Sequence, residues 1–196
     1  MTPATTEIDS DQGAITIVEH LVRLEKGGME VEKAPVRLAH APAFEAPVAE
    51  AQLAELHRAM RATFSPRAAS TALAAAGRRA AMELLRPIPA AERERRLNLP
   101  RTTATAILLA FLRRQSGRFA AERRFTARGG LHPVLVIAAN PLCDPPTRGE
   151  RVCAWHEALF ETLFQALVSP DARVRETTCL ALGDSECRFE VTFGGG

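Results

Sequence analysis

The sequence predicts an α+β fold, with helices through its first two thirds and a small antiparallel sheet towards its end. Up to about residue 115, apolar residues recur every three or four positions, which is typical of amphipathic helices. Beyond Ser116-Gly117, short apolar runs alternate with turn residues, a pattern that indicates hairpins. The 196 residues, 46% hydrophobic and 24% charged, suffice for one domain. We expect that domain at residues 12–193, between a flexible tail at 1–11 and a short tail at 194–196.

Most of the expected helices have a start or stop signal in the sequence. Gly27-Gly28 end the first, and a proline-spaced strand and loop follow it at Ala34–Pro47. Ser65 suits the N-cap of the third helix, and Pro66 suits its first turn. In the last of these helices, four residues are expected to face inward: Ile107, Leu108, Phe111 and Leu112. The expected helices are Gln12–Lys26, Val48–Thr63, Pro66–Leu85, a short charged segment after Pro89, and Thr102–Gln115.

The later part of the chain predicts two hairpins separated by a helix. The first hairpin pairs Arg118–Thr126 with Leu131–Ala139. A proline-containing loop, Asn140–Gly149, and a helix, Glu150–Val168, come next. The second hairpin runs from RETTCLAL through a three-residue turn, Gly183 to Ser185, to CRFEVTF. In that register Cys179 lies opposite Phe189, which places the two hairpin cysteines on one face.

The sequence predicts neither a membrane span nor a secretory signal. The longest apolar runs, Ala106–Leu112 and Val134–Ala139, are far shorter than the ~20 residues that cross a bilayer. The first eleven residues are polar and acidic, without a basic start and an apolar core. We therefore expect a cytoplasmic protein with no transmembrane segment.

The net charge of +2 conceals a basic middle section. Residues 78–128 hold 13 arginines and 4 acidic residues, or +9, between sections of −3 and −4. This section is either an anion-attracting surface or a set of solvated helix faces. Nucleic-acid binding would need the arginines to share one face, and no recognition motif supports it, so no nucleic-acid partner is expected. The arginines concerned are Arg93, Arg95, Arg96, Arg113 and Arg114.

Three of the four cysteines have a spacing that can bind a metal. Disulfides are rare in the cytosol, so the alternatives are metal binding and burial as small apolar side chains. Zinc takes about four ligands in a tetrahedron, and thiolates with a carboxylate satisfy it. Cys179 and Cys187 would supply two ligands from the hairpin, Glu176 a third, and Cys153 the fourth from the preceding helix. Spacing alone leaves zinc and burial equally open. His156 is a possible substitute ligand, whereas Cys143 is expected only to pack in the core.

Three stretches between about Gly13 and Val191 resemble the bacteriochlorophyll 4-vinyl reductase domain family. They are Asn140–Cys143 (NPLC), Val152–Phe164 (VCAWHEALFETLF) and Glu176–Val191 (ETTCLALGDSECRFEV). The last, with its E-x2-C, Gly-Asp turn and C-R-F, is the most specific. The same domain is the aromatic-effector sensor of some bacterial activators, in which one helix cysteine, one glutamate and two hairpin cysteines bind zinc. The resemblance therefore favours a structural zinc at Cys153, Glu176, Cys179 and Cys187.

The resemblance also implies a fold and a ligand. The fold has N-terminal helices that enclose an apolar ligand cavity against a small antiparallel sheet, with a zinc-pinned C-terminal hairpin, commonly as a homodimer. The superfamily includes haem-based nitric-oxide sensors. No ATPase or helix-turn-helix accompanies the domain in these 196 residues, so the chain resembles the stand-alone pigment-synthesis member. The expected ligand is a tetrapyrrole, with His132, Trp155 and His156 as candidate pocket residues, although a surface or core position explains each equally well.

The family name implies reduction of a vinyl group, but the sequence contains no motif for a redox cofactor. There is no G-x-G-x-x-G after a strand, no Walker loop and no C-x2-C. We therefore expect a carrier that presents a chlorophyll precursor to the enzymes of bacteriochlorophyll synthesis. The alternatives are a reductase that takes electrons from a partner or an unrecognised nicotinamide site, and a small-molecule sensor.

Overall fold

The computed structural model describes residues 50–120, 124–143 and 150–194. The expected helix Gln12–Lys26, the Ala34–Pro47 stretch and the tail 1–11 lie outside this part of the chain. The α-helices are α2 (Glu50–Thr63), α3 (Pro66–Leu85), α4 (Ala90–Leu97), α5 (Arg101–Gln115) and α6 (Ala154–Leu167). The strands are β1 (Phe125–Arg128), β2 (Val134–Ile137), β3 (Arg173–Thr178) and β4 (Cys187–Thr192). Short 3-10 turns are η1 (Ser116–Arg118), η2 (Pro141–Cys143) and η3 (Leu180–Leu182).

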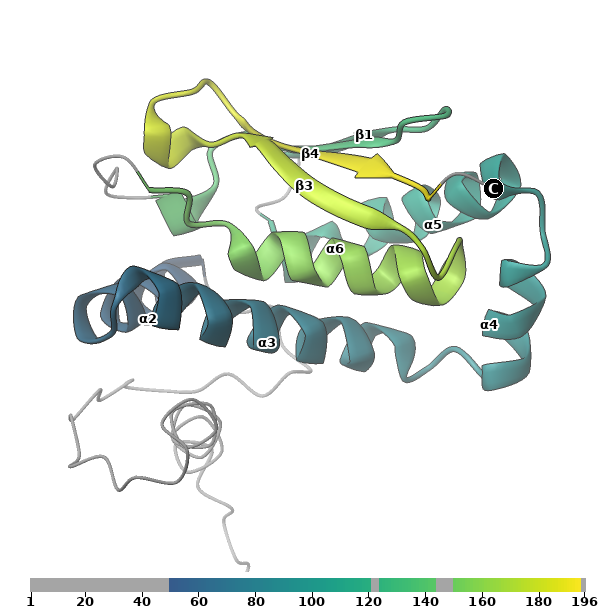
Figure 1. Ribbon diagram of the computed structural model, residues 1–196, viewed down its shortest axis with the longest axis horizontal. Coiled ribbons are helices and arrows are strands. Elements are labelled where there is room, and N and C mark those ends of the chain that lie inside the picture. Colours follow the sequence, from purple (N-terminus) through teal and green to yellow (C-terminus); the bar gives the residue numbers. More distant parts are fainter. Residues whose placement is uncertain (1–49, 121–123, 144–149, 195–196) are drawn as a thin grey trace, which may run out of the picture.

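The predicted α+β fold is confirmed. The four strands form one antiparallel sheet in the order β1-β2-β4-β3, so the two hairpins meet along β2 and β4. Helix α6 packs between β3 and α3, while α5 lies against α6 and β1 (Figure 1). The molecule therefore has layers, with the sheet on one side of α6 and the α3 layer on the other. None of the described helices is both long and apolar enough to cross a bilayer.

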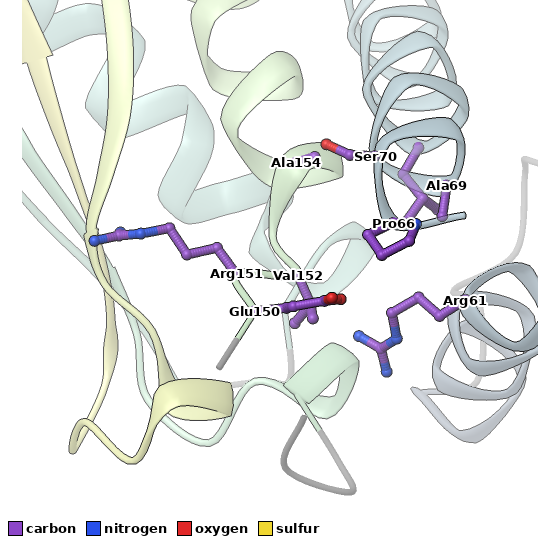
Figure 2. A pocket seen from close by; sticks show the side chains of 9 residues that line it. Arg61, Pro66, Ala69, Ser70, Glu150, Arg151, Val152 and Ala154 are labelled. Carbon is purple, nitrogen blue, oxygen red and sulfur yellow. The ribbon is translucent and has the colours of Figure 1, made fainter. Parts of the chain in front are cut away.

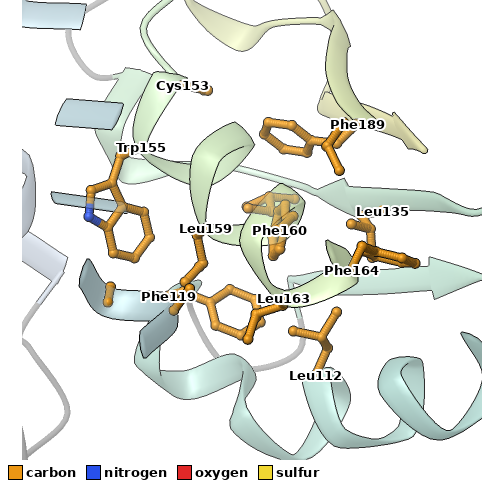
Figure 3. Close-up of a cluster of buried hydrophobic side chains, with 14 of the residues drawn as sticks. Leu112, Phe119, Leu135, Cys153, Trp155, Leu159, Phe160, Leu163, Phe164 and Phe189 are labelled. Atoms are coloured by element: carbon orange, nitrogen blue, oxygen red, sulfur yellow. The ribbon is translucent and has the colours of Figure 1, made fainter. Parts of the chain in front are cut away.

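Helix α6 supplies the centre of the core. Its buried side chains are Trp155, His156, Leu159, Phe160, Leu163, Phe164 and Leu167. The ring of Phe160 lies 5.3 Å from Phe189 of β4 and 5.5 Å from Phe119, between centroids, in edge-to-face contacts (Figure 3). Such aromatic pairs add to the free energy gained by burying their area. The sheet and α5 are thus joined through a single helix.

Helix α3 approaches α6 along a face of small residues. A Cβ added to Gly77 would lie 2.1 Å from the carbonyl oxygen of Trp155, closer than real contacts allow. Ala69, Ala72 and Ala80 are buried on the same helix. The alanine-rich face of α3 therefore serves close helix packing.

Helix boundaries follow the sequence patterns more closely than side-chain facing does. Helix α3 has the expected limits, and the Ser65 hydroxyl accepts the Ala68 N–H at its start, as predicted. In α5, however, Ile107 is 36% exposed and Phe111 is only partly buried. The inward face is shifted, because α5 is buried against both α6 and β1. It consists of Ala104, Thr105, Leu108, Leu109 and Leu112.

The predicted register of the second hairpin is wrong. Strand β3 ends at Thr178, and Glu176, not Cys179, lies opposite Phe189. A 3-10 turn, η3, replaces the end of the predicted strand, and Gly183 adopts φ 95°, which suits a residue without Cβ. The Asp184 carboxylate accepts the Cys179 N–H at 2.7 Å, so a side chain takes the place of a strand partner. The first hairpin is also shorter than predicted, because residues 116–118 form a 3-10 turn.

Candidate metal centre and its surroundings

Four cysteine sulfurs meet at one end of the sheet. We call Cys143, Cys153, Cys179 and Cys187 the cysteine cluster; all four are buried, and their sulfurs lie within 4.8 Å of one another. The Cys143 sulfur lies 3.7 Å from that of Cys153, 4.0 Å from Cys179 and 3.5 Å from Cys187. The Cys153 sulfur lies 4.0 Å from Cys179 and 3.6 Å from Cys187. All four cysteines are free thiols.

Each cysteine comes from the end of a different element. Cys143 ends η2, and Cys153 is the N-cap residue of α6. Cys179 follows β3 directly, and Cys187 begins β4. The partial positive charge at a helix N-terminus favours a thiolate at Cys153. A metal held here would join segments that are 44 residues apart in sequence, which couples metal binding to folding.

Asn140 orients the cluster through both ends of its amide. Its Nδ2 donates to the Cys153 sulfur at 3.3 Å and to the Cys187 sulfur at 3.5 Å. Its Oδ1 accepts the Leu142 N–H at 3.1 Å, which shapes the turn that carries Cys143. Asn140 is 3% exposed. Hydrogen bonds of this kind orient metal ligands and stabilise thiolate charge.

The thiols change one another's acidity. Hydrogen bonds from Cys143, Cys153 and Cys187 lower the pKa of Cys179. Hydrogen bonds with the other thiols, and then burial, raise the pKa of Cys153 well above its usual value. One sulfur in the cluster is therefore stabilised as a thiolate by its neighbours, which is the form that binds a metal.

Glu176 lies beside the cluster. Its side chain interacts with the thiols of Cys153 and Cys179, and burial raises the pKa of its carboxyl to about 9. It is 3% exposed, and its Oε1 has no hydrogen-bond partner among the residues described. Three of the four predicted metal ligands thus bring their sulfurs together, and Glu176 is adjacent to them. The complete predicted set stays a prediction.

Sequence reasoning missed Cys143, which it assigned to packing alone. Cys143 is buried, as expected, but its sulfur faces the other three. A signal was present in Asn140-Pro141-Leu142-Cys143, one of the stretches that carry the family resemblance. The role of that stretch depends on the path of the chain, which spacing does not show.

The donor set of the cluster fits a closed structural metal site. Thiolate sulfurs select zinc among the common divalent ions, and four ligands in a tetrahedron leave no open position for a substrate. Burial of all four side chains excludes bulk water in the same way. The cluster is therefore suited to stabilising the fold and not to catalysis.

The candidate pocket residues lie in contrasting surroundings. His132 is exposed in the segment between β1 and β2. His156 is 0% exposed, and its Nε2 lies 2.7 Å from the Phe119 carbonyl oxygen. Trp155 is 9% exposed, and its ring is perpendicular to that of His156, at 4.9 Å. Trp155 and His156 are neighbours in the core, and His132 lies at the surface. Their role in a pocket stays a prediction.

His57 of α2 is a buried polar residue that sequence reasoning did not single out. It is 1% exposed, and its ring packs edge-on against Trp155 at 6.5 Å. Its Nδ1 has no hydrogen-bond partner within the described chain, and the same holds for Nδ1 of His156. Burial lowers the pKa of His57 to about 3 and that of His156 to about 4. Both imidazoles are therefore neutral at pH 7.

A small cavity of about 240 Å³ lies next to the cluster, where α2, the start of α3 and the segment leading into α6 meet. Arg61, Pro66, Leu73 and Val152 are among its lining residues. Figure 2 shows Arg61 directed towards this space and the Arg151 side chain extending away towards the sheet. The Arg151 guanidinium donates to the Glu176 carbonyl at 2.5 Å. Ligand pockets for drug-sized molecules usually measure about 300–1,000 Å³, so a macrocycle requires the walls to move.

Part of the basic section is used within the fold. Arg95 and Arg96 both pair with Glu92 on α4. Arg113 donates to the Ala127 carbonyl at 2.5 Å, which links α5 to β1. These contacts favour the structural explanation for these three arginines.

Comparisons with known proteins agree with this arrangement. Residues 133–193, which include the whole cysteine cluster, match the family model of the vinyl-4-reductase domain. The chain is 36% identical over 144 residues to the "Bacteriochlorophyll synthase 23 kDa chain" of Cereibacter sphaeroides, a match that covers 72% of this chain and 69% of that protein. The chain belongs to the bacteriochlorophyll synthase 23 kDa chain family. The protein of the same name from Rhodobacter capsulatus is 32% identical over 92 residues, 46% of this chain and 42% of its own length. The predicted resemblance to the 4-vinyl reductase domain family is thereby confirmed.

Two solved structures are similar to the chain. An H-NOX protein from S. oneidensis aligns with a TM-score of 0.50 and 14% identity, covering 94% of this chain and 92% of that one. The phenol-responsive sensory domain of the activator PoxR aligns with a TM-score of 0.49 and 13% identity, covering 91% and 89%. The H-NOX alignment supports the predicted superfamily fold and carries no information on the ligand.

Proposed function

We propose that this chain takes part in bacteriochlorophyll biosynthesis as a tetrapyrrole-binding protein. It would present a chlorophyll precursor, such as a divinyl protochlorophyllide or a magnesium porphyrin, to enzymes of the pathway. The observation that carries the proposal is the chain's membership of a family whose members are named as chains of bacteriochlorophyll synthase. The sequence motifs for nicotinamide, nucleotide and iron–sulfur binding are missing, which favours a carrier over an autonomous reductase.

The pigment would bind on the α2–α3 side of α6. Trp155 and His57 meet there between two helices, and a small cavity already lies next to them at the start of α3 and α6. Removing a flat apolar macrocycle from water contributes about 25 cal/mol per Å², before the cost of ordering. Opening the cavity would therefore be offset by the area that the pigment buries.

His132 is the preferred axial ligand for a magnesium pigment. It is exposed, whereas His156 is fully buried with its Nε2 against the Phe119 carbonyl. An exposed imidazole is free to approach a metal at the centre of a macrocycle without loss of a core contact. His132 must then lie at the edge of the bound pigment, with Trp155 deeper in the site.

A zinc ion at the cysteine cluster would serve the fold and not the chemistry. The cluster is buried and its sulfurs converge, which suits a closed site. Zinc bound there would connect η2, α6, β3 and β4 and so fix the helix that carries Trp155 and His156. We further propose a cytoplasmic homodimer, for which light scattering should give about twice the mass of the chain.

A pigment titration tests the proposal. The purified full chain is mixed with a divinyl magnesium porphyrin, and binding is followed by absorbance and by quenching of Trp155, the single tryptophan. We expect saturable binding at micromolar concentrations. His132→Ala should change the pigment spectrum, and added imidazole should restore it. The absence of saturable binding by any magnesium or metal-free tetrapyrrole would reject the carrier function.

The same mixture with a nicotinamide added tests the alternative enzyme function. A carrier binds the divinyl pigment without converting it, so the vinyl absorbance stays constant. Turnover by the purified chain would replace the carrier by a C8-vinyl reductase. The zinc proposal is independent of either result.

A further inference from the structure

The cysteine cluster has the dimensions of a tetrahedral site made of sulfur alone. A zinc–sulfur bond is about 2.3 Å, so the sulfurs of an ideal tetrahedron lie about 3.8 Å apart. The three distances from the Cys143 sulfur to the others are 3.7, 4.0 and 3.5 Å. The Cys153 sulfur lies 4.0 and 3.6 Å from those of Cys179 and Cys187. Four sulfurs thus already stand at the corners that one zinc ion requires.

The segment that carries Cys143 is held in place from several sides. The Cys143 N–H donates to the Asn140 carbonyl at 3.1 Å. The Asn140 amide binds both the Leu142 N–H and the sulfurs of Cys153 and Cys187. Arg61 of α2 donates to the Leu142 carbonyl at 3.0 Å. The Cys143 thiol is therefore positioned by the fold, as expected of a metal ligand with an outer shell of hydrogen bonds.

We propose that Cys143, and not Glu176, is the fourth metal ligand, so that the site is Cys143, Cys153, Cys179 and Cys187. Glu176 then stays outside the coordination sphere, with its carboxyl beside Cys153 and Cys179. The inference rests on the proposed function only in taking a metal to be bound at the cluster. It is independent of pigment binding and of the pathway.

This ligand set extends what the metal holds together. Turn η2 packs against α2, and Arg61 of α2 bonds to the same turn. A site that includes Cys143 therefore anchors α2, which carries His57, in addition to the hairpin and α6. A site completed by Glu176 would leave η2 and α2 outside the metal-linked unit.

X-ray absorption at the zinc edge of the purified full chain decides the ligand set. We expect four sulfur neighbours at about 2.3 Å and no oxygen or nitrogen in the first shell. Three sulfurs and one lighter atom would overturn the inference and leave a zinc site in place. A chain that binds no zinc would overturn both this inference and the zinc part of the proposed function. The wild-type measurement suffices even if a variant fails to fold.

Variants sharpen the result. Cys143→Ser should weaken zinc binding by more than about 100-fold, beyond the ~10–100-fold typical for loss of an outer-shell contact. With cobalt in place of zinc, it should also lose part of the sulfur-to-metal charge-transfer absorption. Glu176→Gln should keep the four-sulfur spectrum, as should Glu186→Gln, a control on the same hairpin that pairs with Arg188. Loss of a ligand in Glu176→Gln with an unchanged Cys143→Ser would contradict the assignment.

Hydrogen exchange tests the link to α2. Removing the metal from the wild type should increase exchange in Glu50–Thr63 together with the hairpin. In Glu176→Gln the metal should still protect both segments. Protection of the hairpin alone by the metal would contradict the assignment of Cys143.

Discussion

The two ends of α6 differ in how completely the fold prepares them. At its N-terminus, four thiols from four segments converge, and Asn140 already donates to two of the sulfurs. On the α3 side of the same helix, Trp155 and His57 share a buried contact, and the adjoining cavity measures only about 240 Å³. The first region is arranged for its ligand in advance, whereas the second has to open. A rigid centre beside an adaptable one is consistent with a carrier that admits and releases a large pigment.

Loss of one cluster cysteine should have the largest effect. Cys187→Ala removes a ligand and leaves the metal charge unbalanced in a buried site, so we expect loss of zinc and of solubility. A loss of roughly 5 kcal/mol corresponds to a fall of about 10–20 °C in melting temperature for a chain of this size. Calorimetry on the variant and on the chelator-treated wild type should give similar values. A variant that melts like the zinc-bound wild type would remove the metal centre from the comparison.

Acid should weaken the Trp155 side through its two neutral histidines. The pKa of His57 is about 3 and that of His156 about 4 in the folded chain, against 6.5 in the unfolded chain. The unfolded state binds more protons, so stability is full above pH 6.5 and decreases as the pH falls towards 4. Each histidine contributes about 1.4 kcal/mol per pH unit in this window.

His57→Leu isolates this effect. Between pH 6.5 and 5.5, the variant should lose about 1.4 kcal/mol less than the wild type in urea unfolding. The zinc content is measured alongside, because acid also protonates thiolates. Equal pH slopes for the two proteins would mean that His57 is not held neutral by burial.

The contact between α3 and α6 is next in size. Gly77→Ala would place a methyl group 2.1 Å from the Trp155 carbonyl, so the helices must separate. We expect a net loss of about 1–3 kcal/mol, although alanine favours a helix over glycine by about 1 kcal/mol. Gly117→Ala is the matched control, since an added Cβ there meets nothing within 4 Å. Equal stability of the two variants would show that the α3 side is looser than the structure indicates.

The smallest effect is expected at the start of α3, which borders the cavity. The Ser65 hydroxyl accepts the Ala68 N–H at 3.4 Å, a long cap bond. Ser65→Ala should cost about 0.5–1 kcal/mol in urea unfolding. Ser70→Ala, one turn further along the helix, serves as the control. A larger loss for Ser70→Ala than for Ser65→Ala would contradict the role of the cap.

The sequence predicts the elements better than it predicts how they meet. The α+β class and the limits of α3 follow from periodicity and from Ser65-Pro66, because helix signals are local. The register of β3 and β4 depends on the Asp184 contact and the 3-10 turn, which alternation does not show. The family pattern led to Cys153, Cys179 and Cys187. The position of Cys143 depends on how η2 returns to α6, a tertiary feature that residue spacing does not contain.

Metal analysis combined with unfolding tests the central claim, that a metal at the cysteine cluster holds the fold around α6. The full chain is purified without added metal, its zinc content is measured, and its melting temperature is recorded with and without a chelator. We predict about one zinc per chain and a melting temperature that falls by about 10 °C or more when the metal is removed. A metal-free chain that melts at the same temperature as the untreated protein would contradict the claim.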